Sequence, residues 1–510
     1  MPNHSLKFGF PQFNAHRIAL VIIVGFFLLM LSMLQTKFPI FMDEAIFSNI
    51  INRFNQGLGF NTTLFKDFIP YVEHYSYWYP PIYFLVLVPV YLIFGASITV
   101  GRLFSLICGI TTLGLIYNWS KKIFKFKYSG ILVLLLLTTD HYFQDGSIVA
   151  RMELLTLVWG LGALICHTQF LKKRKPNFNL ASGIFSALSL LTHPTAVIML
   201  LPIGLNLLFL KEKNFKQKII TCLNFGLPIL VALATWIISF WPNREIFILQ
   251  NLVQMHRKKF ATVFIIEIFK YQPLPRLVLT IYFISNALFV GRNFLHSKGD
   301  AKKRMLLLLA LTTALLPIFL KEMWYVVYAT VFSSIILVKN LEIWWQKEKI
   351  TLVSTILAGL IMLNSFIFFD NVSTISKQKT DYETFSKTIS DQLPANSRVL
   401  LSSFPDPFFY LEKNRPDLEL QSTPNSPPNE PIDPDVYNKI LDKIDYVVLS
   451  FYLNQHLYTY INNNLDKIIF ENNAAGGYKV WLIKLKPQTE RERLEPPLEQ
   501  TWKYPRLGEN

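Results

Sequence analysis

The sequence has little cysteine and little charge. Only three of its 510 residues are cysteines, and Cys108, Cys166 and Cys222 all fall inside apolar runs. Their placement excludes a disulfide framework and a cysteine metal motif. Charged residues make up 16% of the chain, which is low for a soluble protein, whereas hydrophobic residues reach 52%. The composition therefore predicts that a lipid bilayer surrounds most of the chain.

Apolar runs recur from residue 17 to residue 369. Many approach the roughly 20 residues that a helix needs to cross a bilayer core of about 30 Å. The first run follows Lys7 and Arg17, but no small-residue cleavage site follows it, so we interpret it as a retained helix and not as a signal peptide. We predict about eleven spans, near residues 18–34, 98–118, 128–142, 154–170, 178–192, 194–210, 219–241, 276–293, 305–320, 324–338 and 350–369.

The net charge of +16 is concentrated in the loops between these runs. The basic loops, with Lys7 and Arg17, hold 22 Lys and Arg residues against 4 acidic ones, so the rest of the chain is close to neutral. This pattern indicates membrane topology and argues against nucleic acid as a partner. The clusters lie at residues 121–127, 172–175, 211–218, 292–304 and 339–349.

Short basic loops mark the cytoplasmic side of a membrane protein. The N-terminus is then cytoplasmic, and the external loops are residues 36–97, 142–153 and 242–275. This assignment requires that the apolar stretch 80–95 does not cross, because a crossing would move every later basic loop to the outer face. We therefore expect residues 80–95 to form a helix in or near the outer leaflet. The predicted location is the plasma (inner) membrane.

The composition changes near residue 370, where charges, Asn and Pro increase and apolar runs shorten to strand length. Alternating helix and strand patterns follow, which predict a small α/β domain on the external, periplasmic side. The expected organisation is a transmembrane domain over residues 1–370, the α/β domain over 371–486 and a disordered tail over 487–510. Expected helices are 382–393, 436–443 and 455–465, and expected strands are 398–402, 444–451, 467–471 and 478–484.

Two adjacent carboxylates, Asp43 and Glu44, follow the external end of the first span. Carboxylates at a membrane surface are costly to desolvate, so they indicate a base, a metal ligand or a partner for a cation. The alternative is a solvated pair at the N-terminus of a helix. The next external loop adds Asp145, Arg151 and Glu153 on the same side. For Arg151 or Glu153 taken alone, a pair at the membrane interface is the favoured interpretation.

The third external loop carries Arg257, Lys258 and Lys259, and Lys321 lies in a later external turn. Basic residues on the outer face oppose the topology bias and favour an anionic partner, of which lipid phosphate is the simplest. Nonspecific contact with headgroups is the alternative. Tyr residues near Tyr79 are suited to stacking on sugar rings, although an interfacial aromatic belt also explains them.

The order of these elements resembles a known group. Phe-Met-Asp-Glu-Ala-Ile-Phe at 41–47 is similar to the acidic motif of the GT-C membrane glycosyltransferases, in particular of the protein mannosyltransferase (family 39) and aminoarabinose transferase-like branch. Tyr-Pro-Pro-Ile-Tyr at 79–83 resembles that branch's His-Pro-Pro-Leu-Tyr, with Tyr79 in place of the His. Phe94-Gly95 through Gly101-Arg102-Leu103 resembles its Phe-Gly and Arg-Leu segment, and residues 151–153 stand where it usually has Arg-x-x-Asp.

The resemblance implies a glycosyltransferase with a polyprenyl-phosphate sugar donor and a lipid, glycan or protein acceptor at the outer face. It implies catalytic roles for Asp43, Glu44 and Glu153. Sugar or acceptor contacts would come from Tyr79, Tyr83 and Asp145. The resemblance implies no particular cofactor, and a divalent metal would be compatible with the chemistry. Two other functions remain open, a transporter or flippase and a non-catalytic membrane-anchored binding protein. Donor phosphate contacts would come from Arg151, Arg257, Lys258, Lys259 and Lys321.

Overall fold

The computed structural model places most of the chain. The residues that it describes are 14–36, 42–64, 69–210, 214–259, 273–294, 300–319, 323–346, 349–376, 381–403, 405–422, 441, 443–450, 457, 468–473 and 480–485. The predicted tail over 487–510 lies outside these residues. Two predicted helices, 436–443 and 455–465, also fall almost entirely outside them.

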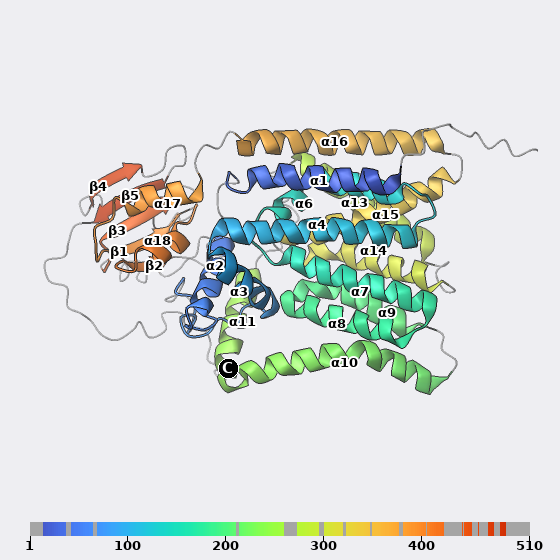
Figure 1. The fold of residues 1–510 in the computed structure, drawn as a ribbon, viewed down its shortest axis with the longest axis horizontal. Helices are drawn as coiled ribbons and strands as arrows, with labels where there is room; N and C mark the ends of the chain where they lie inside the picture. The colour runs from blue at the N-terminus through green and yellow to red at the C-terminus, as the bar shows by residue number, and fades with distance from the viewer. Residues whose placement is uncertain are drawn as a thin grey trace, which may run out of the picture.

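A bundle of long helices forms the larger part of the molecule (Figure 1). Each of the eleven predicted spans coincides with a helix, and among the described residues seven helices are long and apolar enough to cross a membrane. The α-helical polytopic fold with a small α/β unit is thus confirmed. The helices are α1 (Ala15–Met33), α4 (Ile98–Ile123), α5 (Ser129–Thr138), α7 (Glu153–Lys173), α8 (Pro176–Thr192), α9 (Val197–Leu208), α10 (Phe215–Phe240), α13 (Pro273–Asn293), α14 (Ala301–Phe319), α15 (Val326–Trp345) and α16 (Ile350–Ser376).

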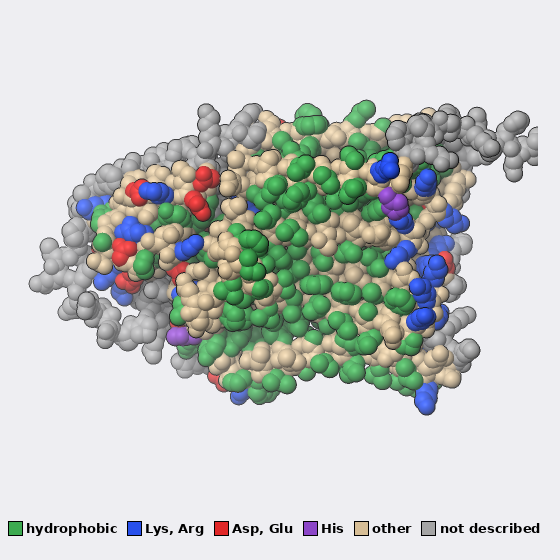
Figure 2. Space-filling view, in the orientation of Figure 1, with side chains coloured by type: hydrophobic (Ala, Val, Ile, Leu, Met, Phe, Trp, Pro, Cys, Tyr) green, Lys and Arg blue, Asp and Glu red, His purple; other side chains and the backbone are tan. Residues whose placement is uncertain are grey.

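The bundle has two chemically different ends (Figure 2). Lys and Arg side chains gather at one end, and apolar side chains cover the helices between the two ends. This is the charge segregation that the basic loops predict. The opposite end carries the short helices α2 (Met42–Asn55), α3 (Ile82–Phe94) and α11 (Arg244–Lys259) (Figure 1). The short helix α6 (His141–Ser147) and the 3₁₀ turns η1 (Pro194–Ala196), η2 (Trp241–Asn243) and η4 (Met323–Tyr325) connect longer helices.

Helix α3 lies beside α2 at this opposite end (Figure 1). Its 13 residues span about 20 Å, which is less than the hydrocarbon core of a bilayer. The predicted span 128–142 is also shorter than expected, because α5 ends at Thr138. Asp140 accepts a hydrogen bond of 2.9 Å from the Phe143 N–H and so starts α6 as a separate helix.

Small and polar residues join the helices inside the bundle. A Cβ atom at Gly183 would lie 2.3 Å from the carbonyl oxygen of Phe225, so only glycine permits this approach of α8 to α10. Asn340 of α15 donates to the hydroxyl and carbonyl oxygens of Ser285 on α13, at 2.9 and 2.8 Å. Membrane helices use such close contacts and hydrogen bonds because lipid removes the hydrophobic drive to associate.

The C-terminal part folds around a five-stranded sheet with strand order β2-β1-β3-β5-β4. Strands β2, β1 and β3 are parallel, and β5 is antiparallel to both β3 and β4. The sequence patterns predicted α17, β1, β3, β4 and β5 but not α18 and β2. The elements are α17 (Tyr382–Ser390), β1 (Arg398–Ser402), α18 (Phe408–Asn414), β2 (Glu419–Ser422), β3 (Tyr446–Ser450), β4 (Ile468–Asn473) and β5 (Val480–Leu485).

Candidate active site

Asp43 and Glu44 lie in the first turn of α2, where the partial positive charge of a helix N-terminus favours carboxylates. Although adjacent, they face different surroundings. The Glu44 side chain is fully buried, whereas 24% of the Asp43 side chain is exposed. Only Asp43 is therefore placed to meet a molecule from outside.

Glu44 is held by a complete set of donors. The Arg102 guanidinium of α4 binds both carboxylate oxygens, with Nε–Oε1 2.8 Å and Nη2–Oε2 2.9 Å. The Ala150 N–H donates to Oε1 at 2.8 Å, and Arg102 also donates to the Leu34 carbonyl at 2.9 Å. Such a bidentate pair is rigid and charge-assisted. The pair therefore fixes the end of α1, the first turn of α2 and the start of the α6–α7 connection relative to α4.

Arg151 lies between the two remaining carboxylates. It donates from Nη1 to Asp43 and from Nη2 to Glu153 Oε1, the second bond at 2.8 Å, and its Nε also reaches Glu153 at 3.1 Å. The guanidinium carbon lies 4.6 Å from the ring centroid of Trp324, a cation–π contact. Arg151 and Glu153 are each about 95% buried. The structure thus brings together Asp43, Arg151 and Glu153, which the sequence placed in two different loops.

Aromatic rings line the inner side of this cluster. Tyr79 and Tyr83 both pack edge-on against Phe47 of α2, with centroid distances of 5.0 and 5.6 Å. Tyr79 is half-buried, whereas Tyr83 is completely buried. Of these two predicted sugar contacts, Tyr79 is the one that reaches the surface, and Tyr83 is enclosed in the core.

The other predicted site residues have different placements. Asp145, on α6, faces His141 across 3.8 Å. Helix α11 ends with Arg257, Lys258 and Lys259, and at these three positions the structure describes only the backbone. Lys321 lies outside the described residues. Their proposed contacts with a donor phosphate stay predictions.

Helix α11 is nevertheless tied to the connection between α2 and α3. The buried Gln250 side chain accepts from the Tyr77 N–H at 2.8 Å and donates to the carbonyls of Pro70 and Tyr75 at 2.9 and 2.7 Å. Asn243 adds a bond of 3.2 Å to the Tyr77 hydroxyl. The segment that carries the basic residues therefore starts beside the loop that carries the acidic ones.

The C-terminal part also contacts α2. Glu412 of α18 accepts hydrogen bonds from Asn49 at 2.5 Å and from Arg53 at 3.1 Å. Lys413 donates to the Ala96 carbonyl at 2.8 Å. The helix that presents Asp43 is thus held from the bundle by Arg102 and from the C-terminal part by Glu412.

Two residues of this region were not assigned roles from the sequence. Arg102 was noted only as part of a motif, and Trp324 was not assigned. A signal for Arg102 did exist, because an arginine within an apolar run needs an anionic partner. Trp324 carried no comparable signal.

The carboxylates do not form a metal centre in the described part of the chain, where no group of three or more His, Cys, Asp or Glu side chains could hold an ion. The positively charged Arg151 guanidinium lies between Asp43 and Glu153 and partly balances the negative charge of their carboxylates.

Comparison with known proteins places this geometry in a structural class. The profile of the family described as dolichyl-phosphate-mannose-protein mannosyltransferase matches residues 79–239, about a third of the chain. The structure of ArnT from Cupriavidus metallidurans in the apo state is similar over 92% of this chain and 98% of its own, with 13% identity and a TM-score of 0.57. The same protein bound to undecaprenyl phosphate gives 12% identity and a TM-score of 0.56 over the same shares.

A second relative is the oligosaccharyltransferase of Archaeoglobus fulgidus in complex with Zn and sulfate. It matches at 13% identity and a TM-score of 0.54, over 84% of this chain and 68% of its own. No match was found among the curated proteins. The resemblance to the GT-C membrane glycosyltransferases is therefore confirmed, and the chain has their fold.

Proposed function

We propose that this protein is a GT-C glycosyltransferase that transfers a sugar from a polyprenyl-phosphate-linked donor to an acceptor at the outer face of the membrane. The observation that carries the proposal is the position of Asp43. Its partly exposed carboxylate is oriented by the buried Arg151–Glu153 pair, in the first turn of α2, which lies at the end of the bundle opposite the basic loops. A carboxylate held in this way is suited to act as a general base.

In the proposed reaction, an acceptor hydroxyl attacks the anomeric carbon of the donor sugar. The hydroxyl proton passes to Asp43, a new bond forms between the acceptor oxygen and the anomeric carbon, and the bond from that carbon to the phosphate oxygen breaks. The electron pair of the broken bond leaves with the polyprenyl phosphate. Cations lower the barrier by stabilising this leaving group, a role for which Arg257, Lys258, Lys259 and Lys321 are the candidates.

Arg151 has a different role in this proposal from the phosphate contact expected from the sequence. Its guanidinium binds Asp43 and Glu153 and lies over the rings of Trp324 and Phe47, so we assign it to the positioning of Asp43. Glu153 acts one step further away, because it fixes the guanidinium that orients the base. Glu44 lies behind them as a structural group that holds α2 in place.

Lipid-linked donors are supported by the structural neighbours. One ArnT structure contains undecaprenyl phosphate, and a structure of AglB from Archaeoglobus fulgidus contains dolichol-phosphate and an inhibitory peptide. Both of these lipids are polyprenyl phosphates. A donor of this class would present its sugar at the bundle end where Asp43 lies.

The test is a comparison of lipid-linked sugars and glycans extracted from cells that carry wild type, Asp43→Asn or Glu153→Gln. Asp43→Asn keeps the shape of the side chain but cannot take a proton, so turnover should fall by about 10²- to 10⁴-fold. The unused donor should accumulate and one glycan class should disappear. Glu153→Gln should give a smaller loss, because that residue acts through Arg151.

The matched control is Asp391→Asn, which removes one carboxylate charge from an exposed pair with Lys387. It should leave all lipid-linked sugars and glycans unchanged. If Asp43→Asn and Glu153→Gln also leave them unchanged at equal protein levels, the transferase proposal fails. A transporter or a binding protein would then be the better explanation of the fold.

A further inference from the structure

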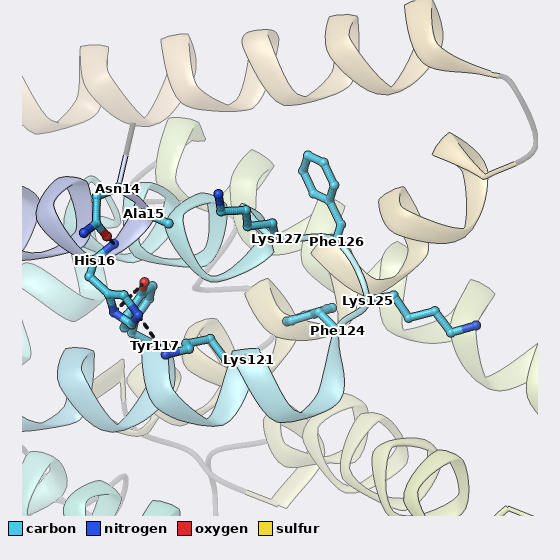
Figure 3. Close-up of a pocket in the computed structure, with 9 residues that line it drawn as sticks. All are labelled: Asn14, Ala15, His16, Tyr117, Lys121, Phe124, Lys125, Phe126 and Lys127. Carbon is cyan, nitrogen blue, oxygen red and sulfur yellow. Dashed lines mark hydrogen bonds between the residues drawn. The ribbon is translucent and has the colours of Figure 1, made fainter. Parts of the chain in front are cut away.

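A cavity of about 500 Å³ opens at the basic end of the bundle, opposite the candidate active site. It lies between the start of α1, the end of α4 and the α4–α5 connection (Figure 3). Its described lining includes Lys121, Lys125, Lys127 and His16, and none of the described lining residues is acidic. The cavity therefore presents positive charge without a carboxylate to balance it.

Two polar groups converge on the His16 ring. The Tyr117 hydroxyl lies 3.3 Å from Nδ1, and the Lys121 ammonium lies 3.2 Å from Nε2. Figure 3 shows Lys127 extending toward the same side as His16, whereas Lys125 points away from it. Lys121 and Lys127, together with His16, thus provide nitrogen groups on one side of the cavity.

The α4–α5 connection that carries Lys127 is held in a fixed conformation. The buried Glu342 carboxylate of α15 accepts hydrogen bonds from the backbone N–H groups of Lys125 at 2.6 Å and of Phe126 at 2.7 Å. The Phe126 ring also stacks on Trp345, with centroids 5.8 Å apart. The buried Glu342 carboxylate thus binds the backbone of the α4–α5 connection, while the side chains of Lys125 and Lys127 in this connection remain exposed. Such preorganisation lowers the entropic cost of binding an anion.

The surface next to the cavity is apolar. Helix α1 begins at the cavity, and on its outer side Leu20, Val21, Val24 and Leu28 are between 44% and 71% exposed. A molecule that has an anionic head and hydrocarbon chains would match both the basic cavity and the apolar face of α1. Free phosphate would contact only the basic cavity.

We propose that this cavity binds the phosphate headgroup of an anionic phospholipid, with Lys121 and Lys127 as the binding cations and the acyl chains along α1. Lys ammonium groups near a membrane surface interact favourably with anionic lipid, and a recessed site adds selectivity to that attraction. By the basic-loop topology, the lipid belongs to the cytoplasmic leaflet. The site is separate from glycosyl transfer and does not depend on the proposed function.

The experiment is native mass spectrometry of the full-length protein released from nanodiscs that contain phosphatidylcholine and phosphatidylglycerol. Wild type should retain phosphatidylglycerol in preference to phosphatidylcholine. The Lys121→Gln/Lys127→Gln variant should lose that preference by roughly 25-fold, because each lysine contributes about a factor of five. The matched control, Lys172→Gln/Lys173→Gln, removes two exposed lysines at the end of α7 and should bind as wild type does.

Two results would overturn the proposal. Equal losses in the two double variants would show that general surface charge attracts the lipid and that the cavity has no part in it. Displacement of the retained lipid by millimolar inorganic phosphate would show that the cavity takes free phosphate. Thermal unfolding of both variants checks that the exposed substitutions leave the fold intact.

Discussion

Glu44 and Arg102 form a fully buried bidentate ion pair, in which two hydrogen bonds of 2.8 and 2.9 Å join α2 to α4. The two residues are 58 positions apart in the chain. Asp43, the proposed base, directly precedes Glu44 in the chain, so the Glu44–Arg102 pair also determines the position of Asp43. The two adjacent carboxylates thus have different roles: Glu44 holds α2 in place, and Asp43 faces the proposed acceptor.

Removal of one partner of this pair should destabilise the protein strongly. Arg102→Met leaves Glu44 buried without its main cation, which costs about 3–5 kcal/mol, and the double variant Arg102→Met/Glu44→Gln should recover part of that loss. Thermal unfolding in detergent measures both. Lys387→Met breaks the exposed Lys387–Asp391 pair and should change the unfolding temperature little, because solvent screens an exposed ion pair. Equal costs for Arg102→Met and Lys387→Met would contradict the structural role of the buried pair.

Glu412 should affect α2 from the C-terminal side. Glu412→Ala removes the acceptor of the Asn49 and Arg53 hydrogen bonds, each worth about 1.5–3 kcal/mol because the acceptor is charged. Hydrogen exchange in α2 should become faster and glycosyl transfer slower. The control is Glu419→Ala, which removes an acid that is 63% exposed at the sheet edge. Unchanged exchange in α2 of the Glu412 variant would rule out this support.

Asp406 makes stability depend on pH. Burial raises the pKa of this carboxyl to about 7, although the hydrogen bond from the Phe408 N–H acts in the opposite direction. Since the folded state then holds the proton more tightly than the unfolded state, stability is greatest below the ordinary pKa of an aspartate. It falls as the pH rises toward 7 and is constant above that value.

The measurement for Asp406 is thermal unfolding of wild type and Asp406→Asn between pH 4 and pH 8. The amide keeps an oxygen for the Phe408 N–H and carries no charge, so the variant should be more stable than wild type near pH 8 by a few kcal/mol. The difference should shrink as the pH falls toward 4. A difference that is independent of pH would show that the carboxyl does not titrate in this range.

Labelling should reveal the orientation in the membrane. Cysteine placed at Lys125, at the basic end, should be protected from an impermeant reagent added to intact cells, because that end is expected to face the cytoplasm. Cysteine at Lys387 of α17, which is 62% exposed, should be labelled. Permeabilised cells provide the control, in which both positions should react. Labelling of the cysteine at position 125 in intact cells would show that the topology is the reverse of the one predicted.

Sequence patterns were most informative where the relevant physics is local. Apolar runs of sufficient length predicted eleven helices, and five of the elements of the C-terminal part followed from helix and strand periodicity. Helix α18 and strand β2 were missed because seven and four residues are too few for a periodic signal. The separation of basic residues to one end was also predicted, since loop charge reflects which side of the membrane a loop occupies.

The site was only partly predictable. Its residue types, a carboxylate pair, an Arg with a Glu, and aromatic rings, were evident from the sequence, but their assignments to partners were not. The sequence could not show that Arg151 binds Asp43, because 108 residues separate them. It also gave no reason to distinguish the two adjacent acids, whose burial differs only through the packing of α4 against α2.

The sequence by itself determined that the chain enters a membrane, which end of the bundle is basic and which loops gather at the other end, because hydropathy and charge act residue by residue. The tertiary structure alone decided that Glu44 is enclosed by Arg102 while Asp43 remains accessible beside Arg151. Such pairings depend on distances between distant segments, and only the packed helices set those distances.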